Sequence, residues 1–170
     1  PTVFKSLEED YFHLKTAVQI WDVSVERQIE ISGLDSARLI QTMTPRDLSN
    51  ISTKKCFYMP LVNDKGGMLN DPVLLMLEPN KYWLSIADSD VLYWISGLAS
   101  ALKLNVTITE ANIYPLAVQG PSATRLMCNI FGEKIKKLPF FGASKFKFGK
   151  KEILISRSGY SKQLGFEIYV

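Results

Sequence analysis

The chain has 170 residues, 46% of them hydrophobic, so it can bury a substantial core as one domain or two small ones. Its formal net charge is only +3, and His13 is its single histidine, which disfavours histidine metal sites and Ser-His-Asp triads. No apolar run reaches the ~18 residues that span a membrane, and no recognised nucleic-acid-binding motif accompanies the charge. We therefore expect neither a membrane nor a nucleic acid as a partner.

The cysteines, the lysines and the ends of the chain bear on where the protein works, what it binds and how long it is. Cys56 and Cys128 lie far apart in apolar contexts, and we interpret them as reduced, buried thiols of a cytoplasmic protein. Seven lysines lie between residues 134 and 151. We interpret them as a solvated surface, with a docking face for an anionic partner, such as a polyglutamate tail, as the alternative. The chain begins without methionine and stops within a strand pattern, so we expect a fragment of a longer protein.

The first part of the chain predicts a short amphipathic helix over residues 7–18 and a strand over 28–31. Asp35 and Ser36 can cap a helix that runs to about residue 43, where Thr44-Pro45 ends it. The next part predicts strands over 56–62, 73–77 and 82–87, a helix over 89–102 capped by Asp88 or Ser89, and a strand over 106–110. This βββαβ stretch is typical of an antiparallel unit.

The last part predicts a strand over 114–118, a helix over 122–131, and strands over 145–148, 152–156 and 165–170. Residues 31–39 resemble residues 118–126, since both read as a strand, a glycine turn, a small polar cap and a helix carrying Arg-Leu. The simplest interpretation is two strand-helix halves packed in one sheet, with the βββαβ unit inserted between them. The predicted fold class is α+β, antiparallel sheets flanked by helices. The first lobe would comprise residues 1–45 and 113–170, and the nested second lobe residues 46–112.

Asp71 is a candidate functional residue at the end of a glycine-rich hairpin turn. Gly66 and Gly67 let the backbone pass close to another surface. Asp71 then precedes the strand over 73–77, which is apolar on both faces, and a carboxylate at the mouth of a buried strand can bind a ligand or stabilise charge. The alternative is an ordinary turn residue.

Glu167 and Tyr169 form a second candidate pair, because they share one face of the last predicted strand. A carboxylate beside an aromatic ring suits a flat heterocycle with a donor edge, since the carboxylate accepts two N–H bonds and the ring offers a stacking face. The alternative is a pair of exposed residues on an edge strand.

Taken in order, these segments resemble the glycine-cleavage T-protein (aminomethyltransferase) family over roughly residues 21–169. The resemblance rests on an ordered set of short motifs: Trp21-Asp22-Val23-Ser24, Asn-x-x-Gly-Gly-x-x-x-Asp ending at Asp71, Gln-Gly-Pro opening a helix at 119, and Ser-Arg-Ser-Gly-Tyr followed seven residues after its tyrosine by Glu167. It implies a three-lobed protein that binds tetrahydrofolate in a central cavity, with the C-terminal part of the fold absent from this chain.

The resemblance also implies residue roles. Asp71 would be catalytic, near the reacting nitrogens of folate, and Glu167 would hold the amino edge of the pterin. Tyr58 would line the folate site, and we place Tyr169 with it among the residues that bind the cofactor. Arg157 would be mainly structural.

Departures from the family pattern bear on the substrate. Asn70 and Asp71 stand where glycine-cleavage enzymes usually show two aspartates, and the chain has 15 lysines against 5 arginines. Together with this composition, the segment Ser-Gly-Tyr-Ser-Lys-Gln-Leu-Gly-Phe-Glu-Ile-Tyr over residues 158–169 resembles a sulfonium-demethylating branch of the family. That branch implies methyl transfer from dimethylsulfoniopropionate to N5 of tetrahydrofolate, without a metal, giving 5-methyltetrahydrofolate and methylmercaptopropionate. The alternatives are an aminomethyltransferase of the glycine cleavage system and a non-catalytic folate-binding protein.

The expected partners are therefore tetrahydrofolate and a small-molecule sulfonium, and a homo-oligomer is compatible with the sequence. Aromatic walls would help to hold a sulfonium cation, with core packing as the alternative role of the same residues. The candidates are Trp21, Trp83, Tyr93 and Trp94.

Overall fold

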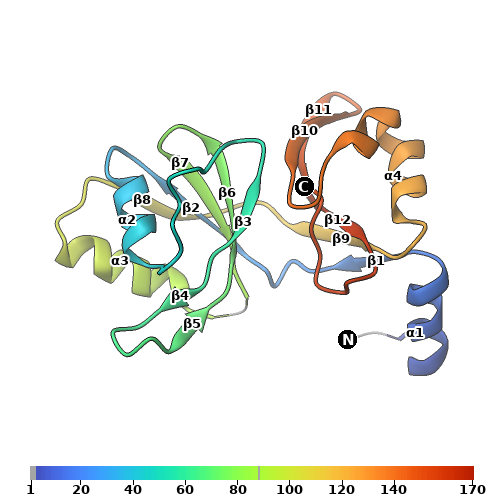
Figure 1. Cartoon of the computed structure of the whole chain (residues 1–170), viewed down its shortest axis with the longest axis horizontal. Coiled ribbons are helices and arrows are strands. Elements are labelled where there is room, and N and C mark those ends of the chain that lie inside the picture. Colours follow the sequence, from blue (N-terminus) through green and yellow to red (C-terminus); the bar gives the residue numbers. More distant parts are fainter. Residues whose placement is uncertain (1–2, 88) are drawn as a thin grey trace. The chain divides into compact units, whose positions relative to one another are not determined.

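A computed structural model describes residues 3–87 and 89–170, and the chain divides into two compact units (Figure 1). The split unit comprises Pro1–Val23 and Pro115–Val170, and the inserted unit comprises Ser24–Tyr114. Each unit contains one five-stranded antiparallel sheet with helices packed on one face. This architecture confirms the predicted α+β class.

The sheet of the inserted unit has the strand order β3-β6-β7-β2-β8, and a separate two-stranded hairpin, β4-β5, projects beside it. The elements are β2 (Gln28–Ser32), α2 (Ser36–Thr42), β3 (Cys56–Tyr58), β4 (Leu61–Val62), β5 (Met68–Asn70), β6 (Val73–Glu78), β7 (Lys81–Ser85), α3 (Val91–Ala101) and β8 (Thr107–Ala111).

The core of the inserted unit lies between one face of this sheet and the helices α2 and α3. Ile29 and Leu84 are paired neighbours on that face, and both are fully buried. Leu39 of α2 and Ile95 of α3 pack into the same cluster. Because side chains alternate along a strand, the residues one position away point to the opposite face, which carries no helix of this unit.

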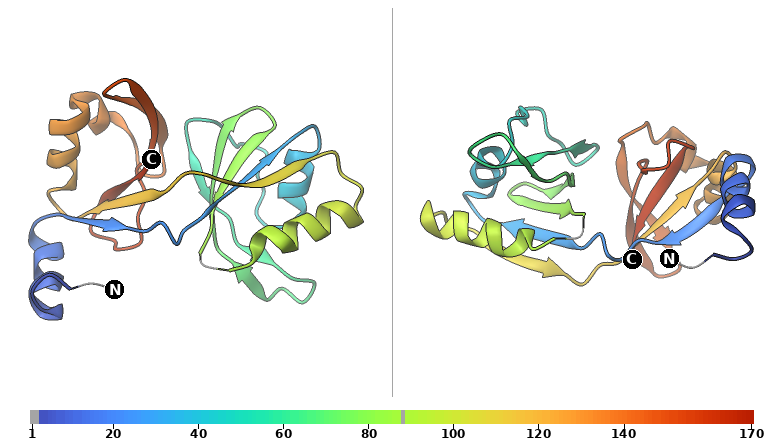
Figure 2. Two further views of the ribbon diagram at one scale, coloured as in Figure 1. Left: turned by 180° about the vertical axis from the view of Figure 1, so that it is seen from behind. Right: turned by 90° about the horizontal axis from the view of Figure 1, so that it is seen from below.

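The sheet of the split unit has the order β1-β9-β12-β11-β10. The elements are α1 (Leu7–Thr16), β1 (Gln19–Asp22), β9 (Pro115–Gln119), α4 (Ala123–Phe131), the 3-10 helix η1 (Glu133–Lys137), β10 (Ala143–Phe148), β11 (Lys151–Ser156) and β12 (Gly165–Tyr169). Met127 of α4 packs with Val118, Ile155 and Phe166 from three central strands, so α4 covers one face of this sheet as well (Figure 2).

The predicted sequence echo corresponds to two matching strand-glycine-helix segments. Gly33 follows β2 with φ +120°, and a Cβ there would lie 2.6 Å from the carbonyl oxygen of Asn105. Gly120 follows β9 with φ +128° and approaches the carbonyl of Ala17 in the same way. Both positions therefore require glycine. The prediction that the two halves share one sheet is wrong, because β2 and β9 lie in different sheets.

The predicted lobe boundary at residue 45 also differs from the structure. β2 pairs with β7 and β8, so residues 24–45 lie with the inserted unit and not with the first lobe. The strand predicted over 56–62 divides into β3 and β4 around Pro60, which has no N–H to donate. The N-cap of α3 is Asp90, and Asp88 lies outside the described residues.

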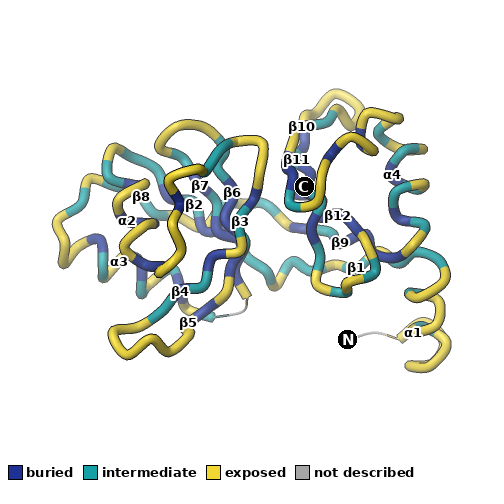
Figure 3. The backbone as a smooth tube through the Cα atoms, in the orientation of Figure 1, coloured by how far each residue is buried: buried dark blue, intermediate teal, exposed yellow. Residues whose placement is uncertain are grey.

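Helix α1 differs from its predicted amphipathic character. Its N-cap, Ser6, accepts a hydrogen bond from the backbone N–H of Glu9 at 3.1 Å, yet none of its residues is buried (Figure 3). Cys56 is buried as predicted, whereas Cys128 on α4 is only half-buried, and neither forms a disulfide. None of the helices within the described ranges has the length and apolar character that crossing a membrane requires.

Candidate functional site

In the inserted unit the predicted site residues lie on the sheet face opposite α2 and α3, and in the split unit they lie on the face opposite α4. Glu167 pairs with Ala117 on β9 and with Ser156 on β11, while Ile168, one position along, faces the core. Tyr169 shares the face of Glu167 because the two lie two positions apart on β12. Tyr58 and Asp71 belong to the inserted unit, where the register Tyr58–Val73–Ser85 runs across the helix-free face.

Three hydroxyl groups surround one carboxylate oxygen of Glu167. Oε2 accepts a hydrogen bond from Ser158 at 2.5 Å and one from Tyr169 at 3.2 Å, and Ser156 lies at 3.5 Å. Oγ of Ser156 is also 2.5 Å from Oγ of Ser158. All four residues are buried, with Glu167 8% exposed. The sequence predicted Glu167 and Tyr169 as a pair, and the structure shows that Ser156 and Ser158 contact the same carboxylate.

The other carboxylate oxygen of Glu167 is left for a different partner. Within residues 3–87 and 89–170, Oε1 accepts no hydrogen bond and the carboxylate has no ion-pair partner. Oε1 of Glu167 does not count among the fully buried side-chain atoms that lack a partner, so it keeps access to the surroundings and can accept a hydrogen bond from a ligand. An N–H donor is the group that a carboxylate oxygen best accepts.

Gln119 fixes the loop that returns Ser158 to the sheet. Its buried amide Nε2 donates to the carbonyl of Ser158 at 3.3 Å, and its Oε1 accepts from the hydroxyl of Ser161 at 2.7 Å. Gly159, with φ +150°, and Gly165 both lie directly against this amide, and a Cβ at either position would overlap it. The two glycines therefore let the loop close over Gln119, which sets the position of Ser158 relative to Glu167.

Arg157 and Tyr160 flank this loop. Nη1 of Arg157 donates to the carbonyl of Leu138 at 2.9 Å, and the guanidinium lies 5.5 Å from the ring centroid of Phe166. These contacts give Arg157 a structural role. Tyr160 is 95% exposed, so its side chain contributes little to the packing.

Tyr58 and Asp71 form the second predicted pair, at the base of the β4-β5 hairpin. The hydroxyl of Tyr58 donates to Oδ2 of Asp71 at 3.2 Å. Partial burial of the phenol, and then the neighbouring carboxylate of Asp71, raise the pKa of Tyr58 above its usual value. Asp71 itself is exposed, so its second oxygen can reach a ligand.

Asn70, next to Asp71, attaches the hairpin to the segment that follows β7. Its Nδ2 donates to the carbonyl of Ala87 at 3.0 Å and to the hydroxyl of Ser89 at 2.8 Å. Its Oδ1 accepts from the backbone N–H of Ala87 at 3.1 Å. This arrangement requires a side chain that both donates and accepts, which an ionised aspartate cannot do. Of positions 70 and 71, only Asp71 therefore presents a carboxylate.

The aromatic candidates for holding a cation have different surroundings. Trp21 pairs with Ala117, the residue that also pairs with Glu167, so Trp21 and Glu167 flank a small residue on one face, with Cα atoms roughly 10 Å apart. Nε1 of Trp83 donates to Glu30 at 2.9 Å. Trp94 packs against the core of the inserted unit, and Tyr93 is 74% exposed. Of the four, Trp21 lies closest in register to a predicted site residue.

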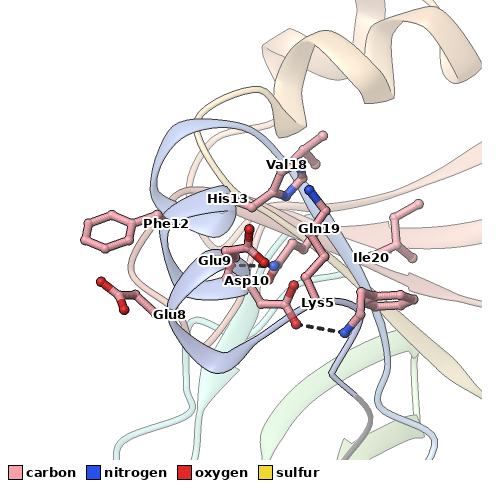
Figure 4. A pocket seen from close by; sticks show the side chains of 10 residues that line it. Lys5, Glu8, Glu9, Asp10, Phe12, His13, Val18, Gln19 and Ile20 are labelled. Carbon is pink, nitrogen blue, oxygen red and sulfur yellow. Dashed lines mark hydrogen bonds between the residues drawn. The ribbon is translucent and has the colours of Figure 1, made fainter.

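Two cavities of the split unit are lined by residues other than Glu167 and its hydroxyl partners. A cavity of about 770 Å³ lies beside α1, and Figure 4 shows Glu9 and Asp10 of this helix on the side toward Gln19, whereas Glu8 points away. A second, of about 570 Å³, is lined by lysines of the predicted solvated surface and by Phe131 and Phe146. Among the residues that the structure describes, no three His, Cys, Asp or Glu side chains gather as metal ligands.

Sequence reasoning missed Ser156, Ser158, Gln119 and the two-way bonding of Asn70. A partial signal existed for Ser156, because two-residue alternation places it with Leu154 on one face of β11. Ser158 lies beyond the end of that strand, where alternation no longer predicts direction. Its position depends on the turn around Gln119, a contact between residues 39 apart in the chain.

The chain matches proteins of known type over its full length. Dimethylsulfoniopropionate demethylase DmdA of Ruegeria pomeroyi is 48% identical over 170 residues, which are all of this chain and 47% of that protein. The aminomethyltransferase of Staphylococcus saprophyticus is 31% identical over 99% of the chain and 48% of its own length. The chain thus spans about half the length of these curated relatives.

Solved structures agree with the fold. The glycine cleavage system aminomethyltransferase T of Bartonella henselae superposes with a TM-score of 0.82 at 22% identity, over 95% of this chain and 44% of that one. The heterotetrameric sarcosine oxidase of Corynebacterium sp. U-96 superposes with a TM-score of 0.66 at 14% identity, over 92% of this chain and 79% of that one. The family described as the GCVT N-terminal domain matches residues 1–170. From the ordered motifs, the fold and this match, we conclude that the chain belongs to the GCVT N-terminal domain family.

Proposed function

We propose that the intact protein transfers a methyl group from dimethylsulfoniopropionate to N5 of tetrahydrofolate. The observation that carries the folate part of this proposal is the Glu167 carboxylate. One of its oxygens is occupied by hydroxyl donors and the other has no partner in the described chain. The amino edge of a reduced pterin offers N–H donors side by side, which fits this acceptor.

Asp71 is proposed as the residue that acts on the reacting nitrogens. Its carboxylate is oriented by the hydroxyl of Tyr58, and its exposure leaves it free to meet a ligand. A fixed negative charge near N5 would offset the positive charge that develops there during methyl transfer. Asp71 need not act as a general base for this role.

The choice of methyl donor rests on two observations. The relative named dimethylsulfoniopropionate demethylase is 48% identical to the chain, whereas the aminomethyltransferases of Staphylococcus saprophyticus and Bacillus pumilus are each 31% identical. In addition, Asn70 replaces one of the two aspartates that glycine-cleavage enzymes usually show, and its amide is bonded in a way that an aspartate cannot reproduce.

For this methyl transfer the protein mainly has to align the sulfonium donor with N5 of the folate acceptor. Bound tetrahydrofolate supplies the N5 lone pair that forms the new N–CH3 bond, while the C–S bond breaks, its electron pair stays on sulfur as a neutral thioether, and the N5 proton passes to solvent. Glu167 and Tyr58 would orient the acceptor, and Asp71 would stabilise the charge. Trp21, beside the Glu167 face, is the aromatic residue that we propose for holding a flat or cationic ligand.

Aminomethyl transfer in a glycine cleavage system is the second candidate, because two relatives with 31% identity are named aminomethyltransferases. The two functions differ in the donor. We propose to incubate the intact protein and tetrahydrofolate with either dimethylsulfoniopropionate or an aminomethyl-lipoyl protein, and to analyse the products by mass spectrometry. Formation of 5-methyltetrahydrofolate from the sulfonium supports the proposal. Formation of ammonia and methylene-tetrahydrofolate from the lipoyl adduct alone would refute it. A cytoplasmic location and a homo-oligomer stay predictions.

A further inference from the structure

In the cluster on the sheet face opposite α4, Ser158 contacts Glu167 more closely than any other hydroxyl does. Its Oγ lies 2.5 Å from Oε2 of Glu167 and 2.5 Å from Oγ of Ser156. Ser158 is 4% exposed and Ser156 is fully buried, so protein atoms and not bulk water set the direction of these hydroxyls. We infer that Ser158 is a positioning residue that turns Glu167 into a selective acceptor for ligand N–H groups.

The hydroxyl hydrogens can be assigned from the contacts. A carboxylate only accepts, so the hydrogens of Ser158 and Tyr169 both point to Oε2 of Glu167. Oγ of Ser158 has then used its hydrogen and can only accept from Ser156. Ser156 is 3.5 Å from Oε2, too far to compete with its contact of 2.5 Å to Ser158. The three hydrogens are thus all committed within the cluster.

The directions of these hydroxyl hydrogens limit which ligand groups the cluster can bind. With every hydroxyl hydrogen committed, the cluster offers a ligand acceptor atoms and no donor from Ser156, Ser158 or Tyr169. Oε1 of Glu167 is the carboxylate oxygen left open to a ligand, and the bonds at Oε2 fix the plane of the carboxylate. A ligand group that is itself an acceptor would face unpaired oxygen atoms, a mismatch that selective sites use to reject analogues.

The position of Ser158 is itself determined by the loop. Its carbonyl accepts from Nε2 of Gln119, and the next residue, Gly159, lies against the same amide. Ser161 provides a matched control on this loop. Its hydroxyl also makes a side-chain bond, to Oε1 of Gln119 at 2.7 Å, and the bonds that Glu167 accepts come from other residues. Ser158→Ala and Ser161→Ala therefore share loop effects but differ at the carboxylate.

The test rests on the proposed folate function and compares tetrahydrofolate with its 2-desamino analogue, which lacks one N–H donor of the pterin edge. Dissociation constants are measured by calorimetry on the intact protein and on the two alanine variants. The wild type should prefer tetrahydrofolate. Ser158→Ala should reduce that preference about tenfold, which corresponds to ~1.4 kcal/mol, while Ser161→Ala should keep it.

The possible outcomes distinguish the positioning role of Ser158 from the proposed folate function. A preference that survives in Ser158→Ala, or falls equally in both variants, overturns the positioning role and leaves folate binding intact. A wild type that binds tetrahydrofolate without preferring it to the analogue removes Glu167 from the pterin edge, and the inference with it. A wild type that binds neither compound contradicts the proposed function.

Discussion

Replacing Asn70 by aspartate exchanges one NH2 group for an oxygen atom at the base of the hairpin and should have a large effect. The amide Nδ2 donates to the carbonyl of Ala87 and to the hydroxyl of Ser89, whereas Oδ1 accepts from the N–H of Ala87. Aspartate retains only the accepting bond. Ser89 can rotate and donate to the new carboxylate, but the carbonyl of Ala87 loses its donor and faces a negative charge.

The magnitude follows from the burial of these groups. Asn70 is 6% exposed, and a buried acceptor that loses its partner costs ~1–3 kcal/mol. With the adjacent carboxylate included, we expect Asn70→Asp to lower the free energy of unfolding by about 2–3 kcal/mol. At about 2–4 °C per kcal/mol, the melting temperature should fall by roughly 4–12 °C. Because a protonated carboxyl can donate again, the deficit should shrink as the pH falls toward ~4.

Asn63 provides the matched control in the same hairpin. Its Oδ1 accepts from the backbone N–H groups of Lys65 and Gly67, at 3.0 and 2.8 Å, and both bonds survive in an aspartate. Asn63→Asp should therefore change the melting temperature little, as measured by differential scanning calorimetry at neutral and acidic pH. Equal melting temperatures for Asn63→Asp and Asn70→Asp would refute the argument that Asn70 is needed as a donor.

Other substitutions test the remaining contacts. Glu167→Gln removes the charge assistance to a pterin N–H and should raise the tetrahydrofolate dissociation constant about tenfold or more in calorimetry, since such bonds contribute ~1.5–3 kcal/mol; an unchanged constant would remove this residue from the folate site. Asp71→Asn should lower turnover about 10²-fold and weaken folate binding much less, and turnover that holds while binding collapses would make it a binding residue only. The same variant should lower the raised pKa of Tyr58, which is visible as earlier ionisation in an ultraviolet titration near and above pH ~10. Because folding raises the pKa of Tyr58, the protonated phenol contributes to the stability of the fold. This contribution is present below the usual tyrosine pKa and is lost as the pH rises through the raised pKa. Gly159→Ala forces a Cβ into the amide of Gln119 at φ +150° and should destabilise the protein by ~1–3 kcal/mol. An unchanged melting temperature in thermal unfolding would contradict this.

The elements that the sequence predicted well are those with local signals. The turn at Asn63 forms as expected because Gly66 supplies a positive φ of 77° and the side chain of Asn63 closes the turn. The apolar run after Asp71 forms β6, an interior strand between β3 and β7, and two-residue alternation correctly placed Glu167 and Tyr169 on one face.

The elements that were missed depend on distant partners. β1 has four residues and pairs with β9, almost one hundred residues later, so nothing local marks it as a strand. For the same reason the sequence assigned β2 to the wrong unit, because its partners β7 and β8 could have been exchanged for β9 without any local penalty. The contact of Ser158 with Glu167 likewise requires the buried Gln119 to fix the intervening loop.

The central claim is that the intact protein moves a methyl group from a sulfonium to folate. Its most direct test uses dimethylsulfoniopropionate labelled with ¹³C in its S-methyl groups, incubated with tetrahydrofolate and the protein and followed by NMR. The account predicts that the label appears on N5 as 5-methyltetrahydrofolate at the rate at which methylmercaptopropionate forms. Label that stays on sulfur with active, folate-bound protein, or that leaves sulfur without reaching N5, would contradict it.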